Sequence, residues 1–273
     1  MLEKVKYINH LNESLEFGKN GLFVNENDLH DFAWEITSQN DKISGFKKGI
    51  VEKTIPVVLV SDSQEEAVVL KNKLFEIFEK DVLAVQPGKI IVGDYYLKCY
   101  AVESSKTDYL TEKRYLKVSL KISTDQPYWV KETSTKFDYE SNLSDGDLDF
   151  NKDFPYDYTS NLMNEKLINS NFTATNFRLN IYGSCVNPKI TIAGHNYEVD
   201  TSIESNEYLT IDSVNKTIIL THTDGAKENC FKNRNKDSYI FEKIPEGTLN
   251  VSINGNFNFE VTLLEERGEP KWT

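Results

Sequence analysis

The sequence has few of the residues from which disulfides and membrane spans are built. Only three of its 273 residues are cysteine, Cys99, Cys185 and Cys230, and none lies in a CxxC spacing. This odd count argues against a disulfide framework and predicts three reduced thiols in a protein that folds in a cytoplasm. No stretch approaches the roughly 18 apolar residues of a membrane span, and the first residues lack the apolar core of a signal peptide. We therefore expect no membrane association.

Motifs that carry chemistry are also missing. The four histidines lie far apart, and no HExxH, zinc-ligand pair, GxSxG, P-loop or GxGxxG occurs. The segment 145–156 places acidic and amide side chains at alternate positions, as an EF-hand loop does. However, Phe150 stands where that loop needs glycine, and Tyr156 stands where it needs a bidentate glutamate. The sequence therefore predicts no enzyme activity, no metal site and no cofactor.

Positive charge is in deficit. The chain has 31 Lys and Arg against 43 Asp and Glu, a formal net charge of -12. This balance argues against non-specific nucleic-acid binding and against an anionic membrane surface as partner. The 14 Tyr and 15 Phe, in contrast, favour strands.

The first half of the chain predicts strands around one helix. Residues 54–60 are an apolar strand, and Asp62 followed by Glu65 has the spacing of a capping box. Apolar residues then recur every three or four positions, which predicts a helix that buries Ala67, Leu70, Leu74, Ile77 and Phe78. A hairpin turn is expected at 93–94, and residues 115–124 alternate as a strand that Pro127 ends.

The second half reads as strands and turns throughout. Residues 131–160 are rich in Ser, Asp, Asn and Thr and indicate a linker or surface excursions before a second domain. A Gly-first turn at Gly194-His195 would pair Ile192 with Tyr197. Residues 207–221 predict a further hairpin that faces Leu209 against Leu220 and Ile211 against Ile218. This strand density, at least seven strands in about 100 residues, is typical of a β-sandwich.

The closing stretch, residues 248–263, predicts a hairpin whose turn lies near Asn254, Gly255 and Asn256. A two-residue loop at Asn254-Gly255 would set every apolar residue opposite a polar one. A three-residue loop that includes Asn256 sets Ile253 opposite Phe257, with Asn256 in the left-handed conformation. We therefore favour the three-residue loop.

Four motifs in the second half follow one another in a set order. They are Gly183 with Asn187-Pro188, then Leu209, Ile211 and Asp212, then Phe241, Ile244, Pro245 and Gly247, and last Arg267, Glu269, Pro270 and Trp272. With this order, the chain resembles the distal tail (Dit) proteins of long-tailed, non-contractile bacteriophages. The first half matches the family more loosely and ends its long strand on a Pro-aromatic pair, here Pro127, Tyr128 and Trp129.

The resemblance implies a mainly β fold in two domains. Residues 1–134 would form a β-sandwich-like belt domain with one helix and a hairpin, and residues 135–273 a galectin-like β-sandwich. It also implies a homohexameric ring at the virion tail tip, assembled in the cytoplasm of the bacterial host. The ring would bind the tail tube protein, a tail-associated tip protein, and receptor-binding or baseplate proteins. DNA would pass through without being bound specifically.

The resemblance gives the C-terminal residues a structural interpretation. A Trp after a helix-breaking Pro is better explained by docking than by a frayed end, so residues 265–273 are expected to pack on the belt domain or on a neighbouring subunit, with Arg267 beside a carboxylate. Pro127, Tyr128, Trp129, Glu269 and Pro270 are further candidates for structural or subunit contacts. The alternative function is carbohydrate-binding adhesion through the second domain, where Tyr182, Tyr197, Tyr208 and Tyr239 could stack on sugars.

Overall fold

A computed structural model describes residues 4–18, 21–24, 27–107, 114–139 and 166–272. The chain divides into two compact units. The first comprises Met1–Lys131 and Glu266–Thr273, and the second comprises Glu132–Glu265. The predicted mainly β fold with one α-helix is confirmed for the described part of the chain. The segment that resembles an EF-hand loop, 145–156, lies outside the described residues.

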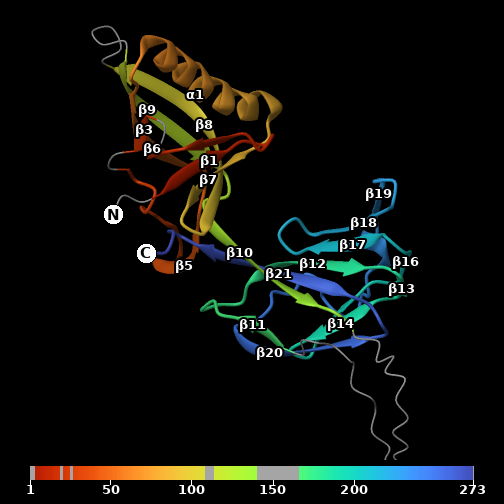
Figure 1. Ribbon diagram of the computed structural model, residues 1–273. Coiled ribbons are helices and arrows are strands. Elements are labelled where there is room, and N and C mark those ends of the chain that lie inside the picture. Colours follow the sequence, from red (N-terminus) through yellow and green to blue (C-terminus); the bar gives the residue numbers. More distant parts are fainter. Residues whose placement is uncertain (1–3, 19–20, 25–26, 108–113, 140–165, 273) are drawn as a thin grey trace, which may run out of the picture. The chain divides into compact units, whose positions relative to one another are not determined.

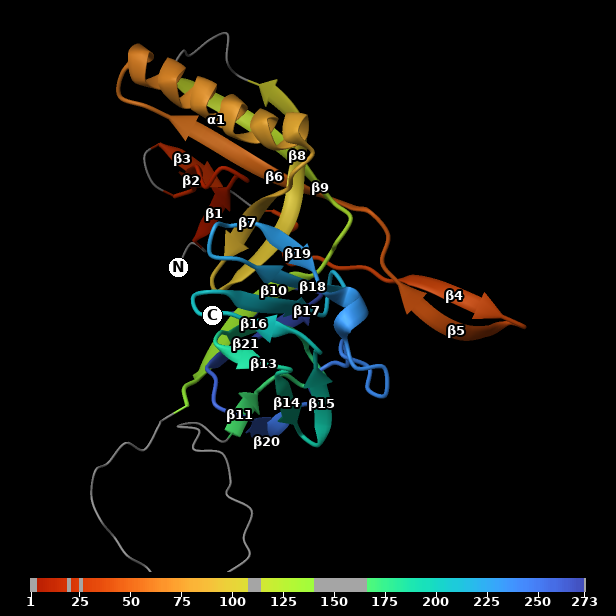
Figure 2. The same ribbon diagram turned by 90° about the vertical axis from the view of Figure 1, so that its right-hand side faces the viewer.

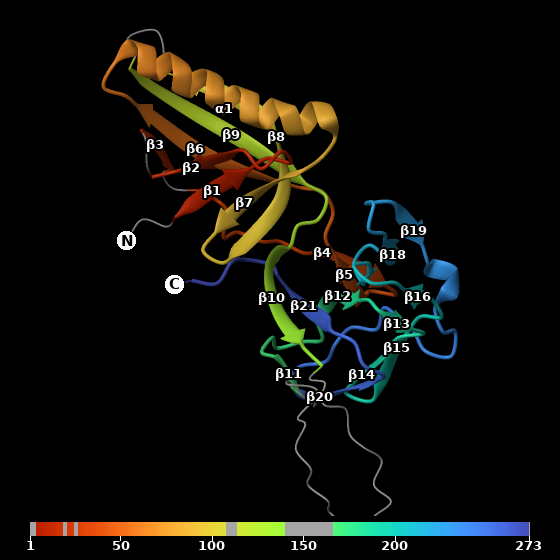
Figure 3. The ribbon, with the colours of Figure 1, turned by 45° about the vertical axis from the view of Figure 1, so that its right-hand side comes forward.

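The first unit consists of antiparallel strands and a long helix (Figure 1). In chain order these are β1 (Val5–Ile8), β2 (Ser14–Glu16), β3 (Leu22–Val24), β4 (Glu35–Gln39), β5 (Lys42–Lys47), β6 (Val51–Val60), α1 (Gln64–Ala84), β7 (Gly88–Val92), β8 (Tyr95–Thr107) and β9 (Tyr115–Thr124). The strand β8 is shared, because its first half pairs with β7 and its second half with β9. The resulting orders are β2-β1-β7-β8 and β3-β6-β9-β8, and α1 lies along the second group (Figure 3).

The helix begins one residue later than the capping-box spacing predicts. Ser63 is the N-cap, and its hydroxyl accepts from the Glu66 backbone N–H at 3.1 Å. Glu66, not Glu65, reaches back, and its carboxylate accepts from the Asp62 N–H at 3.3 Å. The predicted apolar face is confirmed, since Ala67, Leu74, Ile77 and Phe78 are buried and Leu70 packs against the same core.

The second unit is a two-layer sandwich. After β10 (Trp129–Phe137), which begins in the first unit, its strands are β11 (Lys166–Asn169), β12 (Asn176–Tyr182), β13 (Cys185–Val186), β14 (Lys189–Ile192), β15 (His195–Glu198), β16 (Ser202–Ile203), β17 (Tyr208–Asp212), β18 (Thr217–Thr221), β19 (Lys227–Asn229), β20 (Gly247–Asn254) and β21 (Phe259–Arg267), with a 3₁₀ turn η1 (Phe231–Asn233). One layer has the order β19-β18-β17-β12-β21-β10, and the other has β11-β20-β14-β15. The apolar faces of both layers form one core.

Two of the predicted hairpins of this unit can be compared directly with the structure. In β17–β18, Leu209 pairs with Leu220 and Ile211 with Ile218, as predicted. In β14–β15 the turn lies one residue earlier than predicted, at Ala193-Gly194, and Ile192 pairs with His195. Both turn residues have positive φ, 51° and 83°, which is the conformation of a type I′ turn. Both registers bury the same side chains, so the period-two pattern does not distinguish them.

The predicted closing hairpin is wrong. Strand β20 pairs with β11 and β14, whereas β21 pairs with β12, so the two strands lie in opposite layers of the sandwich. Ile253 lies opposite Ile190 rather than Phe257. Gly255 has a φ of 99°, and Asn256 is not among the residues with positive φ. The apolar faces of the two strands do meet, but across the core, where side chains of facing sheets interdigitate.

The motif residues of the second unit hold turns and core positions. A Cβ at Gly183 would collide with the backbone carbonyl of Glu204, and Asn187 has a φ of 48°. The Asp212 carboxylate accepts from the backbone N–H groups of Val214 and Asn215, both at 2.9 Å, and so closes the β17–β18 turn. These residue types are therefore explained by backbone geometry.

Candidate assembly surfaces

A β-hairpin, β4–β5, extends from the first unit as an isolated two-stranded ribbon (Figure 2). We call residues 35–47 the arm. Its strands are joined at Asn40-Asp41, whose φ values of 51° and 57° match a type I′ turn. This hairpin was not predicted from the sequence, because its polar turn lacks the glycine that marks the strongest hairpin signals.

The arm has one apolar face, and a β-bulge creates it. Ile36 pairs with Phe46, and Ser38 pairs with Ile43 across a register shift. Because cross-strand partners share a face, Ile36, Phe46 and Ile43 point to the same side. Without the shift, the odd spacing between Ile43 and Phe46 would place them on opposite sides.

This apolar face is open to solvent. Ile36, Ile43 and Phe46 are exposed to 61%, 61% and 60%. The other face carries polar side chains, among them the Lys47–Glu35 ion pair at 3.1 Å. A two-stranded hairpin is marginally stable in water on its own, so the arm has the composition of a segment that another surface covers.

The base of the arm is fixed by a cation between two rings. The Lys48 ammonium lies 4.7 Å from the centre of the Trp34 ring and 4.5 Å from that of Tyr128, and it donates to the Pro127 carbonyl at 3.0 Å. Partial burial, and then the nearby Lys53, lower the pKa of Lys48. Trp129, the last residue of the predicted Pro-aromatic group, is a core side chain with 1% exposure. Residues Pro127, Tyr128 and Trp129 therefore anchor the beginning of β10 beside the arm.

The last residues of the chain belong to the first unit. The Trp272 ring stacks on His30 with a centroid distance of 3.9 Å and an interplanar angle of 22°. Pro270 is buried and Glu269 half-buried. The Arg267 guanidinium lies 6.0 Å from the centre of the Tyr95 ring, in a cation–π contact.

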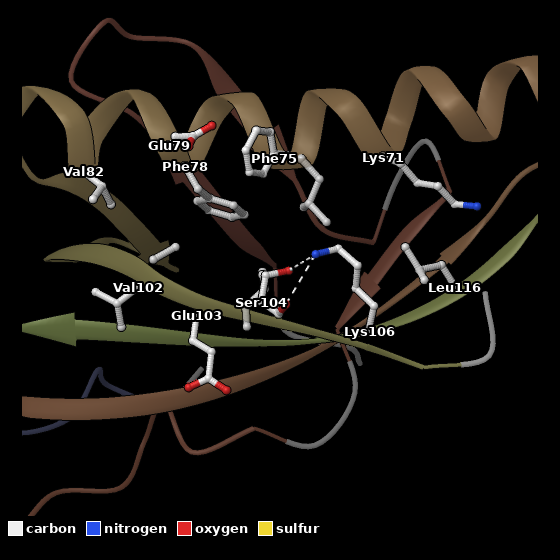
Figure 4. Close-up of a pocket in the computed structure, with 13 residues that line it drawn as sticks. Lys71, Phe75, Phe78, Glu79, Val82, Val102, Glu103, Ser104, Lys106 and Leu116 are labelled. Carbon is white, nitrogen blue, oxygen red and sulfur yellow. Dashed lines mark hydrogen bonds between the residues drawn. The ribbon is translucent and has the colours of Figure 1, made fainter. Parts of the chain in front are cut away.

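A groove lies between α1 and the edge of β8 (Figure 4). Its volume is about 350 Å³. Phe75, Phe78 and Val82 line it from the helix, and Val102 and Ser104 line it from the strand. Figure 4 shows the side chains of Phe75 and Phe78 between the helix and Ser104. Phe75, Val82 and Val102 are exposed to 55%, 42% and 50%, so the groove is a mainly apolar surface in contact with water.

No catalytic or metal arrangement emerges from the described residues. Within them, no group of three or more His, Cys, Asp or Glu side chains could hold a metal. Ser238 Oγ lies 3.2 Å from His195 Nε2, but that hydroxyl donates to the Asn196 carbonyl at 2.7 Å. The same His195 nitrogen lies 3.0 Å from the Tyr239 carbonyl, to which it can only donate. Because the Ser238 hydroxyl donates to Asn196 and the same His195 nitrogen also faces the Tyr239 carbonyl, this pair lacks the geometry of a nucleophile and its base.

The four tyrosines considered for sugar binding separate into different environments. Tyr197 is a core residue with 1% exposure, and its hydroxyl donates to the Glu242 carbonyl. Tyr182 and Tyr208 are cross-strand neighbours on β12 and β17, with ring centres 6.4 Å apart. The Tyr182 hydroxyl donates to Glu260 at 3.1 Å. Tyr239 is exposed and lies apart, beside Phe241.

No protein-family model matches the sequence, and no curated protein matches it. Among the described residues, none of the helices combines the length and the apolar character needed to cross a membrane.

Solved structures of phage proteins, in contrast, match the whole chain. The structure of SPP1 Dit (gp 19.1), described as a paradigm of the hub adsorption apparatus in phages that infect Gram-positive bacteria, has a TM-score of 0.62 at 9% identity, covering 98% of this chain and 100% of that one. A chain of the phage P2 baseplate in its activated conformation with Ca has a TM-score of 0.62 at 12% identity, covering 99% and 100%. The corresponding structure with Sr gives 0.60 at 13% identity, covering 99% and 100%. The protein therefore has the fold of the Dit-type hub proteins of phage tails, as the sequence resemblance predicts.

Proposed function

We propose that this protein is a structural hub of a phage or prophage tail tip, and that it acts as a homohexameric ring without enzymatic activity. The ring joins the tail tube protein to a tail-associated tip protein and to the receptor-binding or baseplate proteins. The likeness to hub and baseplate chains over the full length supports the tail-tip role. In this proposal the protein is assembled in the cytoplasm of the bacterial host and resides at the virion tail tip.

The observation that carries the ring is the uncovered arm. Its apolar face belongs to a hairpin that pairs with no other strand among the described residues. The groove beside α1 is a second open apolar surface of different shape. A contact between two different patches on identical copies is heterologous, and such contacts either close into rings or extend into filaments. These features support assignment of residues 1–134 to ring formation, with residues 135–273 outside the ring.

Mass photometry and negative-stain microscopy of the purified chain test the ring. We expect closed six-membered rings at high protein concentration. Ile36→Asp should abolish them, because it places a charge on the apolar face of the arm, whereas Thr37→Asp on the polar face should leave them intact. A chain that stays monomeric at every accessible concentration, and is not ring-shaped in assembled tails, contradicts the proposal.

Carbohydrate binding by the second unit is the alternative function, and the Tyr182–Tyr208 pair favours it. Two exposed rings beside the Glu260 carboxylate combine apolar stacking surfaces with a hydrogen-bond acceptor, a combination suited to sugar rings. A glycan array tests it. Binding that Tyr182→Ala and Tyr208→Ala remove, and that Tyr239→Ala retains, supports adhesion; an array without binding contradicts it.

A further inference from the structure

We infer that the groove between α1 and β8 receives the arm of a second copy of this chain, which adds a strand to the open edge of β8. The inference rests on the proposed ring and specifies its interface. It depends on three features of the first unit: an unpaired strand edge, an apolar overhang above that edge, and a hairpin with the matching pattern.

The unpaired edge is the second half of β8. From Tyr95 to Cys99, β8 pairs with β7 on one side. The two strands are antiparallel and β7 begins at Gly88, opposite Cys99, so the rest of β8 extends beyond the start of β7. From Glu103 to Thr107, β8 pairs with β9 on one side only, and none of the described strands occupies the other side. An edge of this kind can accept an extended segment through main-chain hydrogen bonds.

The apolar side chains of α1 that lie above this edge, Phe75, Phe78 and Val82, determine which kind of strand can be added. Ser104 and Lys106 pair with Leu120 and Val118, which face the core, so they lie on the side of β8 that α1 covers. A strand placed beside β8 would therefore lie under Phe75 and the neighbouring apolar side chains of the helix. Its face toward the helix must be apolar, and its opposite face can be polar.

The arm has this pattern. Ile36, Ile43 and Phe46 share one face, and Glu35 and Lys47 pair on the other. Within the described residues, the outer edges of β4 and β5 carry no further strand, so either can pair with β8. Covering three side chains that are about three-fifths exposed would offset the marginal stability of an isolated hairpin. A single chain thus carries both complementary surfaces, which is why a second copy is the occupant.

Lys106 presently covers part of the β8 edge. Its ammonium donates to the Ser104 hydroxyl at 3.0 Å and to the Ser104 carbonyl at 3.4 Å (Figure 4). A lysine on an edge strand opposes unwanted pairing, and its flexible side chain can move away when the arm supplies a donor instead. The free chain is thereby protected from aggregation until a matching segment binds.

Two matched pairs of charge variants test the docking through the concentration at which half of the chain is assembled. Phe75→Glu in the groove and Phe46→Glu on the arm should each raise it by about tenfold or more, because each places a charge in the contact. Leu83→Glu, on a helix residue that is 78% exposed and does not line the groove, and Thr37→Glu on the polar face of the arm should leave it within about twofold. Equal effects of groove and control variants overturn the inference.

Cysteine cross-linking provides a readout that does not depend on the strength of assembly. In a Cys185→Ser background, one chain carries Ile43→Cys and a second carries Ser104→Cys, so that a disulfide between them can only join two copies. We expect a covalent dimer on mild oxidation of the mixture, and none when Thr37→Cys replaces Ile43→Cys. Rings that form without this cross-link overturn the arm-in-groove contact but leave the proposed hub function standing. Absence of any oligomer and of the cross-link contradicts both.

Discussion

At the scale of single residues, the His222–Glu207 pair makes the stability of the second unit depend on pH. His222 Nδ1 lies 2.7 Å from Glu207, and Nε2 lies 3.4 Å from Glu228. The hydrogen bond with Glu207 raises the pKa of His222 above 6.5, and the same bond lowers the pKa of Glu207 below 4.5. The histidine contribution is full below 6.5 and is lost as the pH rises through the raised pKa. The Glu207 contribution is present above 4.5 and is lost as the pH falls through the lowered pKa.

We therefore expect Glu207→Gln to lower the melting temperature most between pH 4.5 and 6.5, the interval in which both partners are charged in the native state. The difference from the parent chain should narrow as the pH rises through the raised pKa of His222, because the ring then becomes neutral. Differential scanning fluorimetry across this range measures it, with the exposed Glu246→Gln as a control that should show no such profile. An equal difference at pH 5.5 and 8.5 would contradict the pairing.

At the scale of elements, one buried carboxylate fastens α1 to the strands beneath it. Asp81 is fully buried; it accepts from the Tyr7 hydroxyl at 2.5 Å and from the His10 backbone N–H at 2.8 Å, and it contacts His10 Nδ1. Burial, and then the neighbouring Cys99 and Asp81, raise the pKa of Tyr7, so this hydroxyl remains a donor. A Cβ at Gly88 would collide with the Tyr7 hydroxyl and the Asp81 carboxylate.

Asp81→Ala should destabilise the first unit by about 3 kcal/mol, because it leaves buried donors without an acceptor. Asp81→Asn should cost less, since its amide oxygen still accepts. The exposed Glu76→Ala on the same helix should change stability by less than about 0.5 kcal/mol. Urea unfolding followed by circular dichroism measures these differences. A cost for Asp81→Ala no larger than that for Glu76→Ala would show that the network contributes nothing.

The sequence patterns predict which faces are buried better than they predict what lies opposite them. Period-three-and-four spacing correctly identified the buried face of α1, and Asp81 continues this spacing, but a charged side chain gave no reason to expect burial there. Period-two spacing correctly placed Phe259 and Val251 inward but could not tell a neighbour in the same sheet from one across the core. On the arm the same rule fails outright, because the bulge at residues 43–45 turns Ile43 to the side of Phe46.

At the scale of the whole molecule, the candidate assembly surfaces could not be predicted from the sequence. Whether an apolar side chain is core or interface depends on what remains uncovered after folding, and a sequence does not record this. Helical spacing correctly separates Leu74, which is 3% exposed, from Phe75, which is 55% exposed, but it does not say whether Phe75 meets water or another surface. The family motifs did predict the fold, and residues such as Gly183 and Asp212 hold turns of its backbone.

The C-terminal residues follow the second unit in sequence but belong to the first unit, so their removal should affect the stability of the first unit. Residues 266–273 belong to the first unit, where Trp272 stacks on His30 and a Cβ at Gly268 would meet the ring of Phe32. Trp272→Ala should cost about 1 kcal/mol, the typical worth of an aromatic pair, whereas Lys271→Ala should be neutral. Deletion of residues 266–273 should cost more stability, since it also removes the buried Pro270.

Hydrogen exchange shows where the chain is destabilised. We expect faster exchange around residues 27–32 and unchanged protection in strands β12 and β17. Protection lost mainly in the second unit, or nowhere, would mean that the stacked ring contributes no stability.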